Sequence, residues 1–154
     1  MSAQTTAIEV ALPPHDVFEY VTDPEKFGEW QANVTGGHLE GAGASRLGAR
    51  CVTIRRIGFA ERSVSSEITL FDPPHRWGVR GVDGPIRAIV DVFVDPIDGG
   101  RGSQLTISID FRGHGIGKVL VPLIIRPQAR REMPANIKRL KERVEEAASG
   151  QPPD

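Results

Sequence analysis

Apolar residues toward the C-terminal end of the chain recur at the spacing of an α-helix. Four of them are separated by four, three and four positions, which places them along one side of a helix: Met133, Ile137, Leu140 and Val144. Charged residues fill most positions in between, so the opposite side is polar. We predict a helix over Gly117–Ser149 that begins with the apolar run Val119–Ile125 and covers one face of a sheet.

Most of the preceding chain alternates between apolar and polar residues, which is the period of a β-strand with one buried face. The clearest case is Gln104–Phe111, in which odd-numbered residues are apolar and even-numbered residues are polar. Turn sequences such as Asp83-Gly84 separate successive strands, which favours antiparallel neighbours. Predicted strands cover residues 5–12, 34–40, 49–58, 59–71, 75–82, 86–94 and 104–111.

Two short helices are predicted after the first strand. Pro14 suits the first turn of a helix, where its missing N–H needs no partner, and Asp23 before Pro24 has the character of an N-cap. The whole order predicts an α+β fold, in which a curled antiparallel sheet of about six to seven strands wraps around one long C-terminal helix. Such an arrangement leaves an elongated, mostly apolar space between sheet and helix.

Length, charge and cysteine content narrow the class of protein. The 154 residues suit one domain, expected over residues 1–150 with a flexible tail at 151–154. A net charge of -1 gives no general attraction to nucleic acid, and the single cysteine, Cys51, fits a reducing compartment. We find no signal peptide and no apolar run long enough to cross a bilayer. We therefore expect a cytoplasmic monomer or homodimer without membrane insertion.

Three segments of the chain resemble a known group of proteins. They are Ile8–Trp30, where a strand leads into a proline-started helix and an Asp-Pro turn; the hairpin Asp98–Gly100 followed by Gln104–Ile107; and the last helix around Ile137–Lys141. Together they resemble the START-like, helix-grip superfamily, in particular its bacterial polyketide cyclase/dehydrase and lipid-transport (SRPBCC) group. The resemblance implies a helix-grip fold. Members include cyclases, lipid carriers, hormone receptors and activators of other proteins, so it implies no single activity.

The predicted space between sheet and helix is the candidate functional site. We expect it to bind a hydrophobic small molecule, such as a lipid or a polyketide. Two alternatives stay open: a polyketide cyclase or dehydratase acting on such a ligand, and a non-catalytic module that binds a partner protein. The residues predicted to line the space are Trp30, Val52, Ile54, Val64, Ser66, Ile68, Trp77, Val79, Ile107, Ile109, Phe111, Val119, Leu123 and Met133.

Candidates for catalysis are few. Asp91 stands in an apolar strand, and we expect it to form an outward ion pair with Arg87 or Arg80 in preference to a catalytic role. His114, near the start of the long helix, could take a proton beside a carbonyl. The histidines and Cys51 lack the spacing of metal ligands. We therefore expect no metal and no cofactor, and an enzyme of this fold would be a cyclase or dehydratase without metal.

Overall fold

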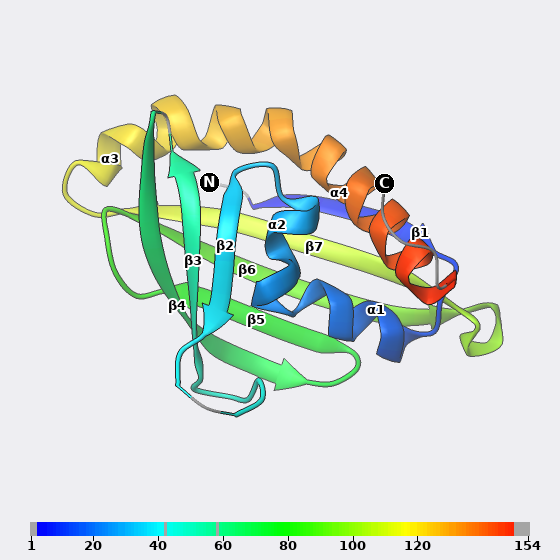
Figure 1. Ribbon diagram of the computed structural model, residues 1–154. Coiled ribbons are helices and arrows are strands. Elements are labelled where there is room, and N and C mark those ends of the chain that lie inside the picture. The colour runs from blue at the N-terminus through cyan, green and yellow to red at the C-terminus, as the bar shows by residue number, and fades with distance from the viewer. Residues whose placement is uncertain (1–2, 42, 58, 150–154) are drawn as a thin grey trace.

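The computed structural model describes residues 3–41, 43–57 and 59–149, which form one antiparallel sheet of seven strands with helices on its concave side (Figure 1). The strand order is β1-β7-β6-β5-β4-β3-β2, so the first two strands of the chain form the two edges. The strands are β1 (Gln4–Val10), β2 (Val34–Leu39), β3 (Arg50–Ile57), β4 (Ala60–Asp72), β5 (Arg76–Gly81), β6 (Ile86–Ile97) and β7 (Gly102–Gly113). The predicted tail, residues 151–154, lies outside the described residues.

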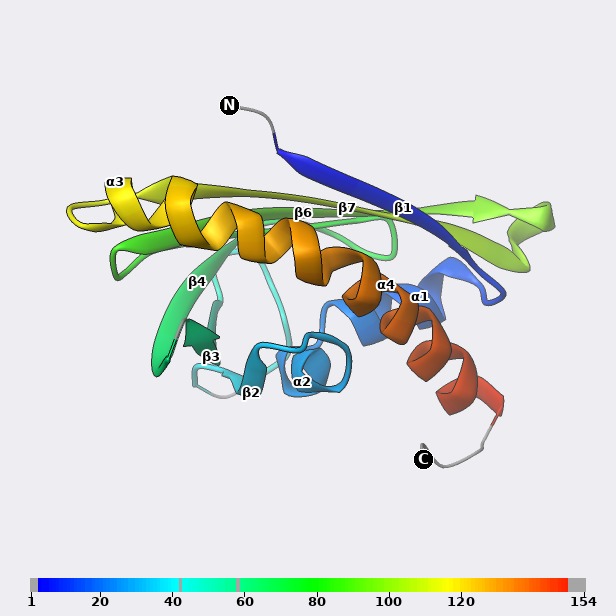
Figure 2. The same ribbon diagram turned by 90° about the horizontal axis from the view of Figure 1, so that it is seen from above.

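The helices occur in two groups along the chain. The first group follows β1, as predicted, and the second follows β7 and runs across the concave side of the sheet (Figures 1 and 2). A single turn, η2 (Asp98–Gly100), joins β6 to β7. The other segments are α1 (Pro14–Val21), η1 (Pro24–Lys26), α2 (Phe27–Trp30), α3 (Gly117–Leu120), η3 (Val121–Ile125) and α4 (Arg126–Ser149). The predicted α+β, helix-grip architecture is confirmed.

The signals that predicted the two short helices act as expected. Pro14 is the first residue of α1, where the absence of an N–H leaves no hydrogen bond unmade. The Asp23 side chain caps η1 by accepting a hydrogen bond from the Glu25 N–H at 3.0 Å. Both helices bury their apolar side chains against the sheet and α4.

The sheet is strongly curled, because β2, β3 and β4 turn away from the other four strands (Figure 2). The pairing of β4 with β5 shifts by one residue between Ile68 and Leu70, and a second shift occurs near the start of β2. Such irregularities bend a strand and increase its twist. Gly37 brings β2 close to η1, since a Cβ atom there would lie 2.5 Å from the carbonyl oxygen of Pro24.

The predicted helix over Gly117–Ser149 is present but not uniform. A π-helical turn, η3, separates α3 from α4 and contains Pro122, which has no N–H to donate. Wide turns of this kind accommodate an interruption of the helical hydrogen bonds. Residues before and after η3 therefore do not follow one continuous apolar stripe.

The predicted stripe of α4 is part of the hydrophobic core. Ile137, Leu140 and Val144 are at most 3% exposed, and α4 contacts β1, α1 and α2. Other fully buried side chains come from the sheet and from α1, namely Val10, Val17, Val21, Ile68, Val92, Val94 and Leu105. Among the described residues, no helix combines the length and the apolar character needed to cross a membrane.

Candidate functional site: a cavity between the sheet and α4

A cavity of about 140 Å³ lies between the sheet and the first half of α4. One buried water needs roughly 10–15 Å³ of comparable space, so the cavity is large enough for an organic molecule. Its wall is formed by β3 to β7, by α1, α2 and the segment that follows α2, and by η3 and α4.

The sheet side of the wall is apolar and continuous. Val90 is paired with Ile109 in the antiparallel register of β6 and β7, and paired residues share one face of a sheet. Alternation then brings every second residue of both strands to the cavity. These lining residues are Ile86, Ala88, Val90 and Val92 of β6 with Ile107, Ile109 and Phe111 of β7.

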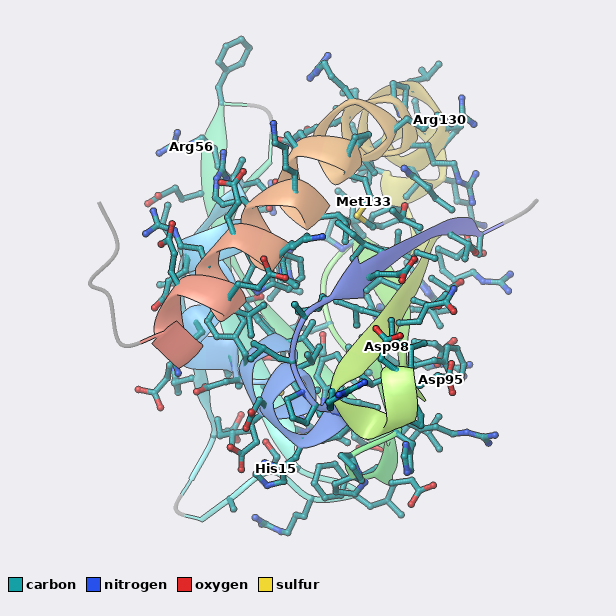
Figure 3. All side chains as sticks on the ribbon, turned by 90° about the vertical axis from the view of Figure 1, so that its right-hand side faces the viewer. His15, Arg56, Asp95, Asp98, Arg130 and Met133 are labelled. Atoms are coloured by element: carbon teal, nitrogen blue, oxygen red, sulfur yellow. The ribbon has the colours of Figure 1, made fainter. Side chains whose placement is uncertain are left out.

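The helix side of the wall adds both apolar and polar groups. Met133 points from α4 into the molecule, whereas Arg130 points away from it (Figure 3). Gln128 and Glu132 lie one turn apart and also line the cavity, with Gln128 Nε2 donating to Glu132 Oε1 at 3.0 Å. The first half of α4 therefore presents a carboxylate and an amide beside its apolar side chains.

A buried polar contact fixes α4 next to the cavity. The side-chain oxygen of Asn136 accepts a hydrogen bond from the backbone N–H of Ala32 at 3.1 Å. Asn136 is only 9% exposed, and it lines the cavity one turn beyond Glu132. The contact ties the middle of α4 to the segment between α2 and β2.

Arg55 of β3 is the one basic residue among the described residues that line the cavity. Its Nε atom donates to Thr53 Oγ1 at 3.1 Å, and its Nη1 atom donates to Gln31 Oε1 at 3.0 Å. Burial lowers the pKa of the Arg55 guanidinium to about 10, because the charged form loses contact with water. The side chain is still protonated at neutral pH.

Two tryptophans enclose the same space. Phe27 lies edge-on to both rings, with centroids 6.2 Å from Trp30 and 6.2 Å from Trp77. The indole N–H groups of Trp30 and Trp77 are buried and have no acceptor among the described residues. A buried donor without an acceptor is uncommon, and a bound molecule is one way to satisfy it.

The structure brings most of the predicted lining residues together. They come from five separate elements and surround one cavity: Trp30, Val64, Ser66, Trp77, Val79, Ile107, Ile109, Phe111 and Met133. Ile68 lies on the predicted face of β4, but it is fully buried in the core and does not line the cavity.

The prediction for β3 was wrong about its face. Val52 and Ile54 point away from the cavity, and Ile54 is 41% exposed. Cys51 and Thr53 are buried on the opposite face, which they share with Arg55. The apolar residues of β3 indicated the wrong face, because the inward face of this strand carries the polar residues Thr53 and Arg55.

The prediction for α3 and η3 was also wrong. Val119 is 55% exposed and Leu123 is 70% exposed, and neither lines the cavity. Only Val121 and Ile125 of η3 are buried, because the π-helical turn changes which residues face the sheet. Leu123 lies instead on a shallow outer groove together with Arg56 and Ile124.

Asp91 does not line the cavity, because its neighbour Val90 does and successive strand residues face opposite sides. Its carboxylate lies on the outer face close to Gly78, where a Cβ atom would be 2.9 Å from Asp91 Oδ1. The expected ion pair with Arg87 or Arg80 is not formed in the described part of the chain.

His114 lies in the exposed loop after β7 and outside the cavity. Its backbone N–H donates to the Pro85 carbonyl at 2.9 Å, which joins this loop to the β5–β6 turn. A nearby ion pair links Asp110 to Arg126 at 3.2 Å and ties β7 to the start of α4. Neither predicted catalytic residue is thus near the enclosed space.

Sequence reasoning predicted Ser66 but missed the other polar groups of the cavity. On α4 a signal was available, because polar residues at every fourth position flank the apolar stripe. On β3 the only signal was the alternation of Thr53 and Arg55. The missed lining residues are Gln31, Asn33, Arg55, Gln128, Glu132 and Asn136. Across residues 3–41, 43–57 and 59–149, no three His, Cys, Asp or Glu side chains gather in a cluster suited to a metal ion.

The sequence model of one protein family matches residues 1–145 of the chain. Its description is "Polyketide cyclase / dehydrase and lipid transport". The chain belongs to this family. Membership of this family supports a general role in hydrophobic ligand binding or polyketide cyclisation. A search of curated protein sequences finds no match.

Solved structures share the fold of this family member at low sequence identity. A START superfamily protein from Mycobacterium smegmatis has a TM-score of 0.76 and 14% identity, with 96% of this chain and 99% of that chain covered. The Zhui aromatase/cyclase from a Streptomyces species gives 0.75 and 15%, with 97% and 98% covered. A Thermus thermophilus protein gives 0.74 and 17%, with 94% and 98% covered. At these identities the likeness establishes the fold alone.

Proposed function

We propose that the protein binds a hydrophobic small molecule, of lipid or polyketide type, in the cavity between the sheet and α4. The observation that carries this proposal is the unfilled space beside the continuous apolar wall of β6 and β7. The family description, which names lipid transport and polyketide cyclisation, supports the same class of ligand.

The physical basis of binding is removal of apolar surface from water. Each methylene buried against this wall contributes about 0.8 kcal/mol, or about a fourfold gain in affinity. Part of the total is offset by the loss of motion of the ligand. Affinity is therefore expected to rise with chain length until the ligand outgrows the cavity.

Two adjacent residues of β6 provide a matched test. Val90 lines the cavity, whereas Ile89 points to the other face of the sheet. Val90→Phe is expected to fill the space and weaken binding of the neutral dye N-phenyl-1-naphthylamine at least about tenfold, while Ile89→Phe leaves it unchanged. Dye fluorescence measures both, and circular dichroism checks folding. Equal binding by the two variants would exclude this cavity as the site.

A second proposal is catalysis in the same cavity, because Glu132 and Arg55 both line it. Glu132 would take a proton from a carbon next to a substrate carbonyl, and Arg55 would donate a hydrogen bond to the resulting enolate oxygen. Glu132→Gln would then abolish cyclisation of a poly-β-ketone thioester while leaving its binding intact. Unchanged turnover in this variant would remove Glu132 from the mechanism.

A third proposal, binding of a partner protein, draws support from the outer surface of α3 and η3. Ile116, Val119, Leu123 and Ile124 are all exposed there, and exposed apolar side chains that lie close together often mark contact surfaces. Light scattering of Leu123→Lys beside the unmodified protein tests this for self-association. A monomer at all concentrations in both would argue against a homodimer through this surface.

A further inference from the structure

The guanidinium of Arg55 faces the cavity without a negatively charged partner. Its two hydrogen-bond acceptors, Thr53 Oγ1 and Gln31 Oε1, are both neutral. Within the described residues no carboxylate oxygen lies within 4.0 Å of it. A guanidinium has five N–H groups, so most of the donors of Arg55, including both on Nη2, have no protein acceptor.

Holding a positive charge without an anionic partner is energetically unfavourable. The half-buried cation of Arg55 loses part of the solvation of water, and two neutral oxygens offset only part of that loss. The lowered pKa of Arg55 reflects the same desolvation. A bound group with a negative charge would offset this cost, so the cavity favours a ligand that carries one.

The carboxylate of Glu132 does not supply this charge. Glu132 also lines the cavity, but its Oε1 atom accepts a hydrogen bond from Gln128 at 3.0 Å on α4. Arg55 projects from β3, and the two side chains form no ion pair. Glu132 would repel an anion, so a bound anion must lie close to Arg55.

Other groups near Arg55 define what kind of ligand fits. The buried indole N–H groups of Trp30 and Trp77 are further donors without acceptors, and both residues line the same cavity. Apolar side chains of β6 and β7 form the rest of the sheet wall. A single cation beside an apolar wall matches a molecule with one negative charge and a long apolar part.

We propose that the natural ligand is an amphiphile with one terminal carboxylate, and that Arg55 binds this carboxylate through its Nη1 and Nη2 atoms. The planar fork of a guanidinium matches the two oxygens of a carboxylate. The apolar part lies along the wall that contains Val90 and Ile109. This inference rests on the proposed function, since it assumes that the cavity binds a hydrophobic molecule.

The test compares dodecanoate, 1-dodecanol and dodecyl phosphate, which differ only in the head group. Trp30 and Trp77 are the only tryptophans of the chain and both line the cavity, so their fluorescence reports binding. Dodecanoate is expected to bind at least about tenfold more tightly than 1-dodecanol, as for a hydrogen bond to a charged group. Dodecyl phosphate should gain nothing further, because one cation faces the site.

Four variants test the role of Arg55 and of the charges around it. Arg55→Met should bind dodecanoate and 1-dodecanol equally, and Arg55→Lys should keep part of the preference. Arg56→Met is the matched control, because Arg56 is the exposed next residue of β3 and lies outside the cavity (Figure 3). Glu132→Gln should strengthen binding of dodecanoate, since it removes the nearby negative charge.

The outcomes separate this inference from the proposed function. If the unmodified protein binds dodecanoate and 1-dodecanol equally, the carboxylate inference is wrong and the hydrophobic cavity stands. If dodecyl phosphate binds at least about tenfold more tightly than dodecanoate, the inferred head group is a phosphate and the carboxylate inference is wrong. If none of the three binds, the proposed function fails and the inference fails with it. A preference that persists in Arg55→Met, checked for folding by circular dichroism, would exclude Arg55.

Discussion

The two halves of α4 have different surroundings: one packs into the core and the other lines the cavity. The second half, with Ile137, Leu140 and Val144, packs into the hydrophobic core and is almost entirely buried. The first half faces the cavity with Gln128 and Glu132, which are half-buried and polar. A helix fixed at one end by close packing can border an unfilled space at the other. Stability and binding are thus expected to respond to different residues of the same element.

The packed half should produce the largest loss of stability. Leu140 is fully buried, so Leu140→Ala removes apolar contacts and leaves a void. We expect the free energy of unfolding to fall by about 2–5 kcal/mol, measured by urea denaturation. Ligand affinity of the folded fraction should hardly change. A large loss of affinity at unchanged stability would contradict the division between the two halves.

The sheet wall of the cavity, opposite the open half of α4, should tolerate the same kind of change better. Ile109 lines the cavity, so Ile109→Ala widens an existing space and creates no new isolated void. The free energy of unfolding should fall by about 1–2 kcal/mol, close to the transfer term alone. The preferred ligand should become longer, which a series of fatty alcohols would detect. A loss as large as that of Leu140→Ala would show that this wall is packed as tightly as the core.

The smallest effect on stability at neutral pH comes from Cys51, because its thiol changes the free energy of unfolding only above about pH 9. Burial raises the pKa of the Cys51 thiol to about 11, above its ordinary value of 9.0. Between these values the unfolded thiol loses its proton first, so the thiol's contribution to stability is complete below pH 9 and declines as the pH rises to 11. Cys51→Ala should remove that part of the decline in urea denaturation. Identical pH profiles would contradict the raised pKa.

The strands and helices were predictable because their local signals agree with their tertiary surroundings. In β7, strict alternation gave the correct inward face for Ile107 and Ile109. Pro14 and Asp23 began their helices where capping preferences require it. At such residues the local sequence preference and the tertiary environment favour the same conformation.

Most of the polar part of the site was not predicted, because hydrophobicity alone was used to choose the inward face. In β3 the inward residues are Thr53 and Arg55, and the apolar Ile54 is outside. The inward-facing residues of α3 and η3 were predicted wrongly for another reason. An all-apolar run such as Val119–Ile125 contains no polar position to mark the outer side, and Pro122 interrupts the helical period. Both errors concern segments that supply other residues to the cavity wall, namely Arg55 of β3 and Ile125 of η3.

The position of β1 at the edge of the sheet has a consequence for how the chain folds. β1 pairs with β7 along its whole length, from Gln4 opposite Ile109 to Val10 opposite Ser103. During synthesis the first strand must therefore wait until nearly all of the sheet has left the ribosome. Until then β1 has no partner and β6 has an unpaired edge, where strands of other nascent chains could add. Contacts so distant in sequence are typical of domains that fold in milliseconds to seconds.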